Sequence, residues 1–150
     1  MFALLFAFAV QSAFAQTSEN KNENKEKQVN VPMVVKENFA KEYPGKKAKW
    51  GAEDGGYEAE FKINGTDASA VYTPSGHRKS FEAAIKLTEV PAVALEYVKK
   101  NYPTHKITES AKITDDKNTI TYEIEVGKDG KSWDVIFDAT GKFIKQELGD

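Results

Sequence analysis

The chain of 150 residues contains no cysteine and only two histidines. Without cysteine it can form no disulfide, thiolate metal site or cysteine nucleophile, and it offers no cysteine for attachment of a lipid. The histidines, His77 and His105, do not belong to an HExxH pattern, and there is no Gly-rich phosphate loop and no G-x-S-x-G elbow. We therefore expect a protein that is not an enzyme, with no cofactor and no metal site.

The chain also has no excess of charge of one sign and no long apolar run. Its 21 Lys and Arg against 23 Asp and Glu give a net charge of -2, so neither a nucleic-acid surface nor a basic membrane patch is indicated. The run from Phe2 to Val10 is shorter than the roughly 20 apolar residues of a membrane span. It precedes Ala13-Phe14-Ala15, which has the A-x-A form of a signal-peptidase site.

These features predict a signal peptide at 1–15, cleavage before Gln16 and a periplasmic or secreted product. No Lys or Arg precedes the apolar run, so we expect the native start to lie upstream of Met1. The segment 16–30 mixes Glu and Lys with Asn and Gln and contains a single apolar residue. Such a segment cannot offset its ordering entropy, and we predict a disordered tether followed by one domain at 31–150.

The predicted domain consists of two copies of one unit, at 31–86 and 90–148. At an offset of 59, Val31-Pro32 and Tyr43-Pro44 recur as Val90-Pro91 and Tyr102-Pro103. At an offset of 65, a second set of residues recurs: Tyr57, Glu58, Glu60, Gly65, Gly76 and Glu82 return as Tyr122, Glu123, Glu125, Gly130, Gly141 and Glu147. Matches in the same order over both halves indicate a tandem repeat of one supersecondary unit.

Each unit is predicted to be one helix followed by a four-stranded meander. Proline begins each helical pattern, and apolar residues at i, i+4 and i+8 share one helix face: Val35, Phe39 and Tyr43, then Ala94, Val98 and Tyr102. Asn64-Gly65 and Asp129-Gly130 are typical of two-residue hairpin turns. The fold class is therefore α+β, with one antiparallel sheet of roughly eight strands and two helices on one face.

Pairing through these hairpin turns divides the side chains between the two faces of the sheet. The helix side receives the apolar residues, including Phe61, Trp133 and Phe137, which we expect to form the core together with Trp50. The other face is predicted to display Glu58, Glu60, Lys62, Ser69, Val71, Thr73, Glu123, Glu125, Asp134, Ile136 and Asp138. Glu125 should stand directly opposite Asp134, an unfavourable pairing of like charges. A bulge at Gly76 or Gly141 leaves open whether Phe143 or Ile144 points inward.

The order VPxxVxxxFxKxYP, YEAEF, NG and YTPSG, followed by a second VP, YP, YEIEV and IFDATGKF, resembles the PepSY-like, beta-lactamase-inhibitor-like domains of secreted Gram-negative proteins. The resemblance covers nearly the whole chain after the tether. It implies a tandem repeat with helices on one face of a sheet and an open opposite face, which grips a partner protein in inhibitor proteins of similar fold. It implies no catalytic or inhibitory residue.

Three readings of the acidic face follow from its residues. It is a solvated, flat surface kept charged for solubility, or a docking surface for a cationic partner, or a divalent-cation site, since carboxylates suit calcium although no EF-hand-like loop is present. The docking reading assigns partner binding to Glu58, Glu60, Val71, Glu123, Glu125, Asp134 and Ile136. The predicted function is a secreted or periplasmic binding module with an envelope or secreted protein partner; the alternative is a small-ligand or divalent-cation binding protein.

Overall fold

The computed structural model describes residues 29–149, so the predicted signal peptide and nearly all of the predicted tether lie outside the described residues. Each half of the chain contributes one helix and four strands to one antiparallel sheet with the strand order β1 to β8. The elements are α1 (Met33–Glu42), β1 (Lys49–Glu53), β2 (Gly56–Ile63), β3 (Thr66–Tyr72), β4 (Arg78–Ala84), η1 (Leu87–Glu89), α2 (Ala92–Asn101), β5 (Lys106–Asp115), β6 (Ile120–Lys128), β7 (Lys131–Asp138) and β8 (Phe143–Leu148). The predicted fold class is confirmed.

The hairpin register is the one that the turns predict. In both two-residue turns the two central residues have positive φ, 52° and 85° at Asn64-Gly65 and 53° and 76° at Asp129-Gly130, as a type I′ turn requires. Tyr57 accordingly pairs with Tyr72 across β2 and β3, and Glu125 pairs with Asp134 across β6 and β7. The predicted juxtaposition of two carboxylates is therefore present.

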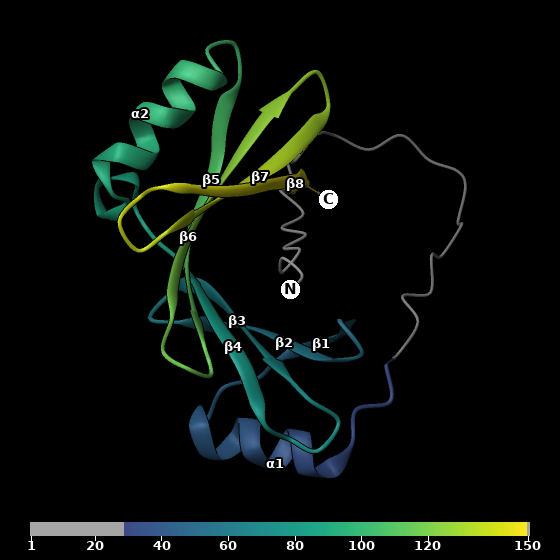
Figure 1. Ribbon diagram of the computed structural model, residues 1–150. Helices are drawn as coiled ribbons and strands as arrows, with labels where there is room; N and C mark the ends of the chain where they lie inside the picture. The colour runs from purple at the N-terminus through teal and green to yellow at the C-terminus, as the bar shows by residue number, and fades with distance from the viewer. Residues whose placement is uncertain (1–28, 150) are drawn as a thin grey trace, which may run out of the picture.

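Each helix covers its own four strands and closes a separate hydrophobic core. Val35 and Phe39 of α1 pack on Phe61 and other side chains of the first half, while Ala94 and Val98 of α2 form a cluster with the second half. Trp50 and Trp133 are partly buried against the first and second cluster, respectively. The two helices lie far apart on the outer side of the molecule (Figure 1).

The turns that follow β3 and β7 dock against the helices, and two glycines of the repeat permit this contact. Gly76 and Gly141 have φ of 88° and 86°, where other residues are strained. A Cβ on Gly76 would lie 2.7 Å from Nδ2 of Asn38, and one on Gly141 would lie 2.8 Å from Cβ of Pro91. These positions thus require glycine both for conformation and for space.

Bulges after these turns settle the orientation of the last strand. The pairing shifts between Val71 and Tyr72 and again between Ile136 and Phe137. Phe143 is thereby turned toward the second core, whereas Ile144 is 49% exposed. Each bulge also increases the local twist of the sheet.

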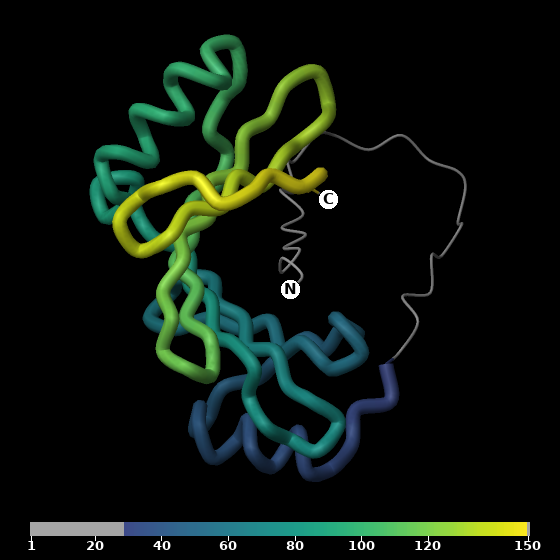
Figure 2. Tube along the Cα trace, viewed as in Figure 1, coloured from purple at the N-terminus to yellow at the C-terminus, as the bar shows by residue number. Residues whose placement is uncertain are grey.

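The sheet is strongly bent, which was not predicted from the sequence. Its two halves are turned toward each other, with α1 and α2 on the outside (Figures 1 and 2). We call the helix-free side of the sheet the inner face, because it is the side that lies between the halves.

Candidate functional site on the inner face

Strand alternation and register bring acidic residues of six neighbouring strands onto the inner face. Glu58 and Glu60 lie on β2 and are paired with Val71 and Ser69 of β3. All seven residues predicted to bind a partner lie on this face: Glu58, Glu60, Val71, Glu123, Glu125, Asp134 and Ile136. The register adds Glu82 of β4, which pairs with Ser69 and Ile113, Glu109 of β5, which pairs with Glu125, and Glu147 of β8, which pairs with Asp134.

Of the three readings of this face, a flat surface kept charged for solubility does not fit the structure, because most of its centre is buried. Glu58, Glu123 and Asp134 expose only 6%, 3% and 3% of their surface. The predicted apolar contacts, Val71 and Ile136, are also buried. Carboxylates are seldom buried so deeply unless they are paired or serve a function, so solubility does not account for this face.

Glu82 is the most deeply buried of these carboxylates and was missed by the sequence reasoning. It is 1% exposed, and neither of its carboxylate oxygens has a hydrogen-bond partner. The hydroxyl of Ser69 opposite it and Oε2 of Glu123 are likewise buried without a partner. An unsatisfied buried polar group costs about 1–3 kcal/mol of stability, and more when it is charged.

Burial and mutual repulsion keep these carboxyls protonated to a higher pH than usual. Burial raises the pKa of Glu82 well above its ordinary value, and the charge of Glu123 raises it further. The pKa of Glu123 is raised as well, mainly by burial and to a smaller extent by the charge of Asp134. Half-buried Glu109 has its pKa raised to about 7, by desolvation first and then by Glu125. Asp67 of the first half and Asp134 of the second also act on Glu109, so both halves contribute to one electrostatic cluster.

Lysines on the inner face pair with acids away from Glu82. Nζ of Lys62 lies 2.5 Å from Oδ1 of Asp67, and Nζ of Lys145 lies 2.6 Å from Oε1 of Glu147. The hydroxyl of Thr108 donates a hydrogen bond to Glu125. These contacts leave the two oxygens of Glu82 unsatisfied.

The sequence did contain a signal for Glu82. Phe81, Ala83 and Ile85 alternate with it, which places Glu82 on the side opposite to the core. The repeat also matches it to Glu147, as it matches Glu58 to Glu123. The bulge expected near Gly76 had left the fourth strand of each unit unassigned.

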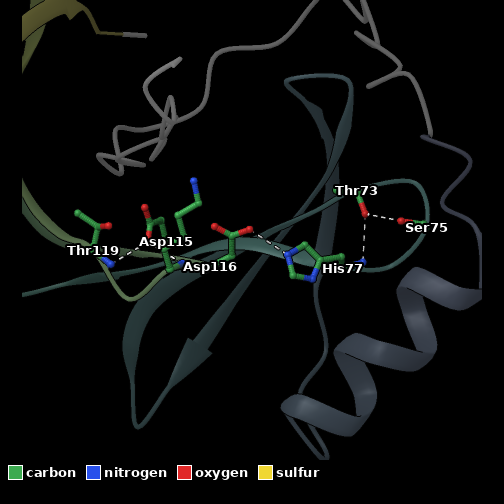
Figure 3. Close-up of polar contacts among 7 residues, drawn as sticks. Thr73, Ser75, His77, Asp115, Asp116 and Thr119 are labelled. Atoms are coloured by element: carbon green, nitrogen blue, oxygen red, sulfur yellow. Dashed lines mark hydrogen bonds and ion pairs between the residues drawn. The ribbon is translucent and has the colours of Figure 1, made fainter.

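A second group of polar contacts lies at the turns that join β3 to β4 and β5 to β6 (Figure 3). Nε2 of His77 lies 3.0 Å from Oδ2 of Asp116, and Oδ1 of Asp115 accepts a hydrogen bond from the N–H of Thr119 at 2.7 Å. The pKa of Asp115 is lowered, chiefly because its carboxylate accepts the hydrogen bond from the backbone N–H of Thr119. His77 is 62% exposed in its side chain, and these contacts are those of turns tied together at the surface.

A cavity of about 470 Å³ adjoins His77 between α1 and the turn after β3, where Lys41, Glu42 and Arg78 contribute to its lining. Glu42 accepts hydrogen bonds from Tyr72 and Arg78, so these side chains hold α1 against the sheet.

Among residues 29–149, no three or more His, Cys, Asp or Glu residues are arranged to hold a metal ion. No helix in that range is long and apolar enough to cross a membrane.

Residues 52–145 match the model of the PepSY-like family, described as "Putative beta-lactamase-inhibitor-like, PepSY-like". No curated protein matches the chain significantly. The match covers more than half of the chain and lies within the two repeats.

Solved structures share the fold at low sequence identity. A "putative periplasmic" protein from Bacteroides eggerthii superposes with a TM-score of 0.70 at 21% identity, covering 79% of this chain and 88% of its own. A DUF2874 family protein from Bacteroides uniformis superposes with a TM-score of 0.68 at 20% sequence identity, over 78% of this chain and 88% of its own. A BLIP-like protein from Bacteroides fragilis superposes with a TM-score of 0.61 at 15% sequence identity, over 81% of this chain and 91% of its own.

Proposed function

Because the chain belongs to the PepSY-like, beta-lactamase-inhibitor-like family, we propose that it is a non-enzymatic, periplasmic or secreted module that binds a protein partner on its inner face. The partner presents cationic side chains. The observation that carries the proposal is the buried carboxylate cluster, in which Glu82 and Glu123 have oxygens without hydrogen-bond partners. Such a cluster weakens the folded protein by itself, and a cationic partner would relieve it.

The charges of the inner face support a protein partner. Its acids come from both halves of the chain and act on one another, and matched charges spread over a surface are what protein interfaces use for specificity and fast association. The divalent-cation alternative receives no such support from residues 29–149, where no metal-holding group of side chains occurs.

Site-specific photo-crosslinking in the native compartment tests this proposal. A benzoylphenylalanine replaces Lys62, an exposed residue of the inner face, and in a second protein it replaces Glu96, an exposed residue of α2. We expect the same partner to be captured repeatedly from position 62 and not from position 96. The crosslinked peptide of that partner should carry Lys or Arg near the attachment point.

Preferential capture from position 96 would contradict the proposal, as would a crosslinked partner segment that is acidic. The melting temperature of both crosslinker proteins is measured first, because a partner captured by an unfolded protein would say nothing about either surface.

A further inference from the structure

Glu82 of β4 and Glu123 of β6 lie on strands separated by the single strand β5, and the residues of β5 beside them are small or apolar. Glu82 pairs with Ile113 of β5, while Glu123 pairs with Ala111 of the same strand. Ala84, two residues from Glu82 on β4, also pairs with Ala111. Strands lie about 4.8 Å apart, so β4 and β6 are separated by about 10 Å. Two carboxylates at that spacing can approach one planar group from opposite sides.

We propose that Glu82, Glu123 and Ser69 form a pocket for the guanidinium group of one arginine side chain of the partner. This inference rests on the proposed function and specifies the ligand of the same face. Both oxygens of Glu82 are unpartnered and can accept the two parallel N–H groups of a guanidinium. Oε2 of Glu123 and the hydroxyl of Ser69, also unpartnered, can accept further N–H groups. Ala111 and Ile113 offer an apolar surface to the methylene stem.

Arginine fits this pocket better than lysine for two physical reasons. Its guanidinium is more weakly hydrated than an ammonium group, so moving it into a buried site costs less free energy. It also presents five N–H donors in a fixed fork, which matches several acceptors at once, whereas an ammonium group has three donors.

Binding of arginine in this pocket is coupled to the release of protons. Burial, above all, raises the pKa of both Glu82 and Glu123, and nearby acids raise these pKa values further. Glu109 and Asp134 act on both carboxyls, Glu123 and Glu58 act on Glu82, and Glu125 and Glu147 act on Glu123. The cations Lys62 and Lys145 are paired with Asp67 and Glu147. A guanidinium favours the ionised carboxylates, so affinity must rise with pH, by about tenfold per pH unit for each proton released, until both carboxyls are ionised in the free protein.

The test is an NMR titration of the full mature chain with the blocked tripeptide acetyl-Gly-Arg-Gly-amide. Amide shifts and glutamate carboxyl-carbon shifts are followed at pH 5, 6, 7 and 8. The matching peptides that contain citrulline or lysine in place of arginine are titrated in parallel. Citrulline has the same shape as arginine without its charge, so it isolates the contribution of the ion pair.

We expect saturable shifts on β4, β5 and β6 with the arginine peptide, an affinity that rises with pH, weaker binding of the lysine peptide and none of the citrulline peptide. Glu82→Gln and Glu123→Gln should each lower the affinity at least tenfold, while Glu37→Gln on exposed α1 should leave it unchanged. An unaltered amide spectrum of each variant away from the substitution shows that it is folded.

Absence of arginine binding at all four pH values would overturn the pocket, as would an affinity that Glu82→Gln leaves unchanged or that citrulline reproduces. This failure is separable from failure of the proposed function. A partner crosslinked from position 62 with no binding of the arginine peptide would reject only the pocket. Arginine binding with a partner that crosslinks only from position 96 would reject only the docking of a protein on the inner face.

Discussion

Replacing Glu82 by Gln should stabilise the protein at neutral and alkaline pH. Glutamine has nearly the shape of glutamate but no charge, so the substitution removes the buried, unpartnered carboxylate without opening a cavity. Because the amide is as polar as the protonated carboxyl, the gain comes from removing the ionisable group, and it is worth about 1 kcal/mol of unfolding free energy for each pH unit between the ordinary and the raised pKa of Glu82. Under the proposed function, Glu82 would weaken the fold in return for binding, which is a common compromise between stability and function.

The sign of the pH dependence follows from the raised pKa of Glu82. Between its ordinary pKa in the unfolded chain and its raised pKa in the folded protein, the folded state holds more protons, so stability falls as pH rises through this range. Below the ordinary pKa both states are protonated and the penalty disappears. The gain from Glu82→Gln should therefore be near zero at pH 4 and increase toward pH 8.

Urea unfolding of the wild-type protein, Glu82→Gln and Glu37→Gln at pH 4, 6 and 8 measures this difference. Glu37 is exposed on α1, so its variant should follow the wild type at every pH. Glu109, whose pKa is raised to about 7, remains in all three proteins and leaves some pH dependence in each. If Glu82→Gln is less stable than the wild type at pH 8, or if its effect is the same at pH 4 and pH 8, the pKa of Glu82 is not raised by burial as argued.

Four further outcomes are expected. Trp133→Ala should lower the unfolding free energy by about 3 kcal/mol, because it removes an aromatic side chain packed on the second core; a loss below about 1 kcal/mol in urea unfolding would contradict that packing. Gly141→Ala should cost clearly more than Gly65→Ala, since both have positive φ but only Gly141 meets a helix, and equal losses would show that the turn does not dock. The melting temperature should be the same with calcium and with a chelator, because we expect no cation to bind the folded protein. A cation that bound it tightly would raise the melting temperature by several degrees, and such a shift would favour the cation alternative. N-terminal sequencing of the exported protein should begin at Gln16, whereas an intact Met1 in a soluble cytosolic product would refute cleavage there.

The architecture could be predicted because its determinants are local and occur twice. The turns at Asn64-Gly65 and Asp129-Gly130 set the hairpin register, and the alternation beside them assigns each side chain to a face. Phe143 and Ile144 could not be assigned, because a bulge shifts the alternation by one residue. The turns beside these bulges approach α1 and α2 closely, and such contacts between distant parts of the chain cannot be read from a local pattern.

The sequence predicted which face of the sheet carries these acids but not that they are buried. Alternation places Glu58, Glu123 and Asp134 on the helix-free face, yet it carries no information on the bend of the sheet, which brings both halves toward the same space (Figure 2). Neither the burial of these acids nor the raised pKa of Glu109 follows from the alternation within a strand. Glu82 required an assignment of β4, whose start is obscured by the bulge beside Tyr72.

The central claim is that a cationic partner docks on the inner face, and its most direct test is the association rate of the partner identified by crosslinking. Glu60→Lys with Glu125→Lys reverses two partly exposed charges of the inner face, and Glu37→Lys with Glu96→Lys makes the same change of net charge on the exposed faces of the helices. Exposed charges steer encounter and are screened within about 8 Å at physiological ionic strength. We predict that the inner-face variant associates more slowly and with less salt dependence, while the helix variant retains most of the wild-type rate. Equal rates for the inner-face variant and the wild type across salt concentrations would place recognition on another surface.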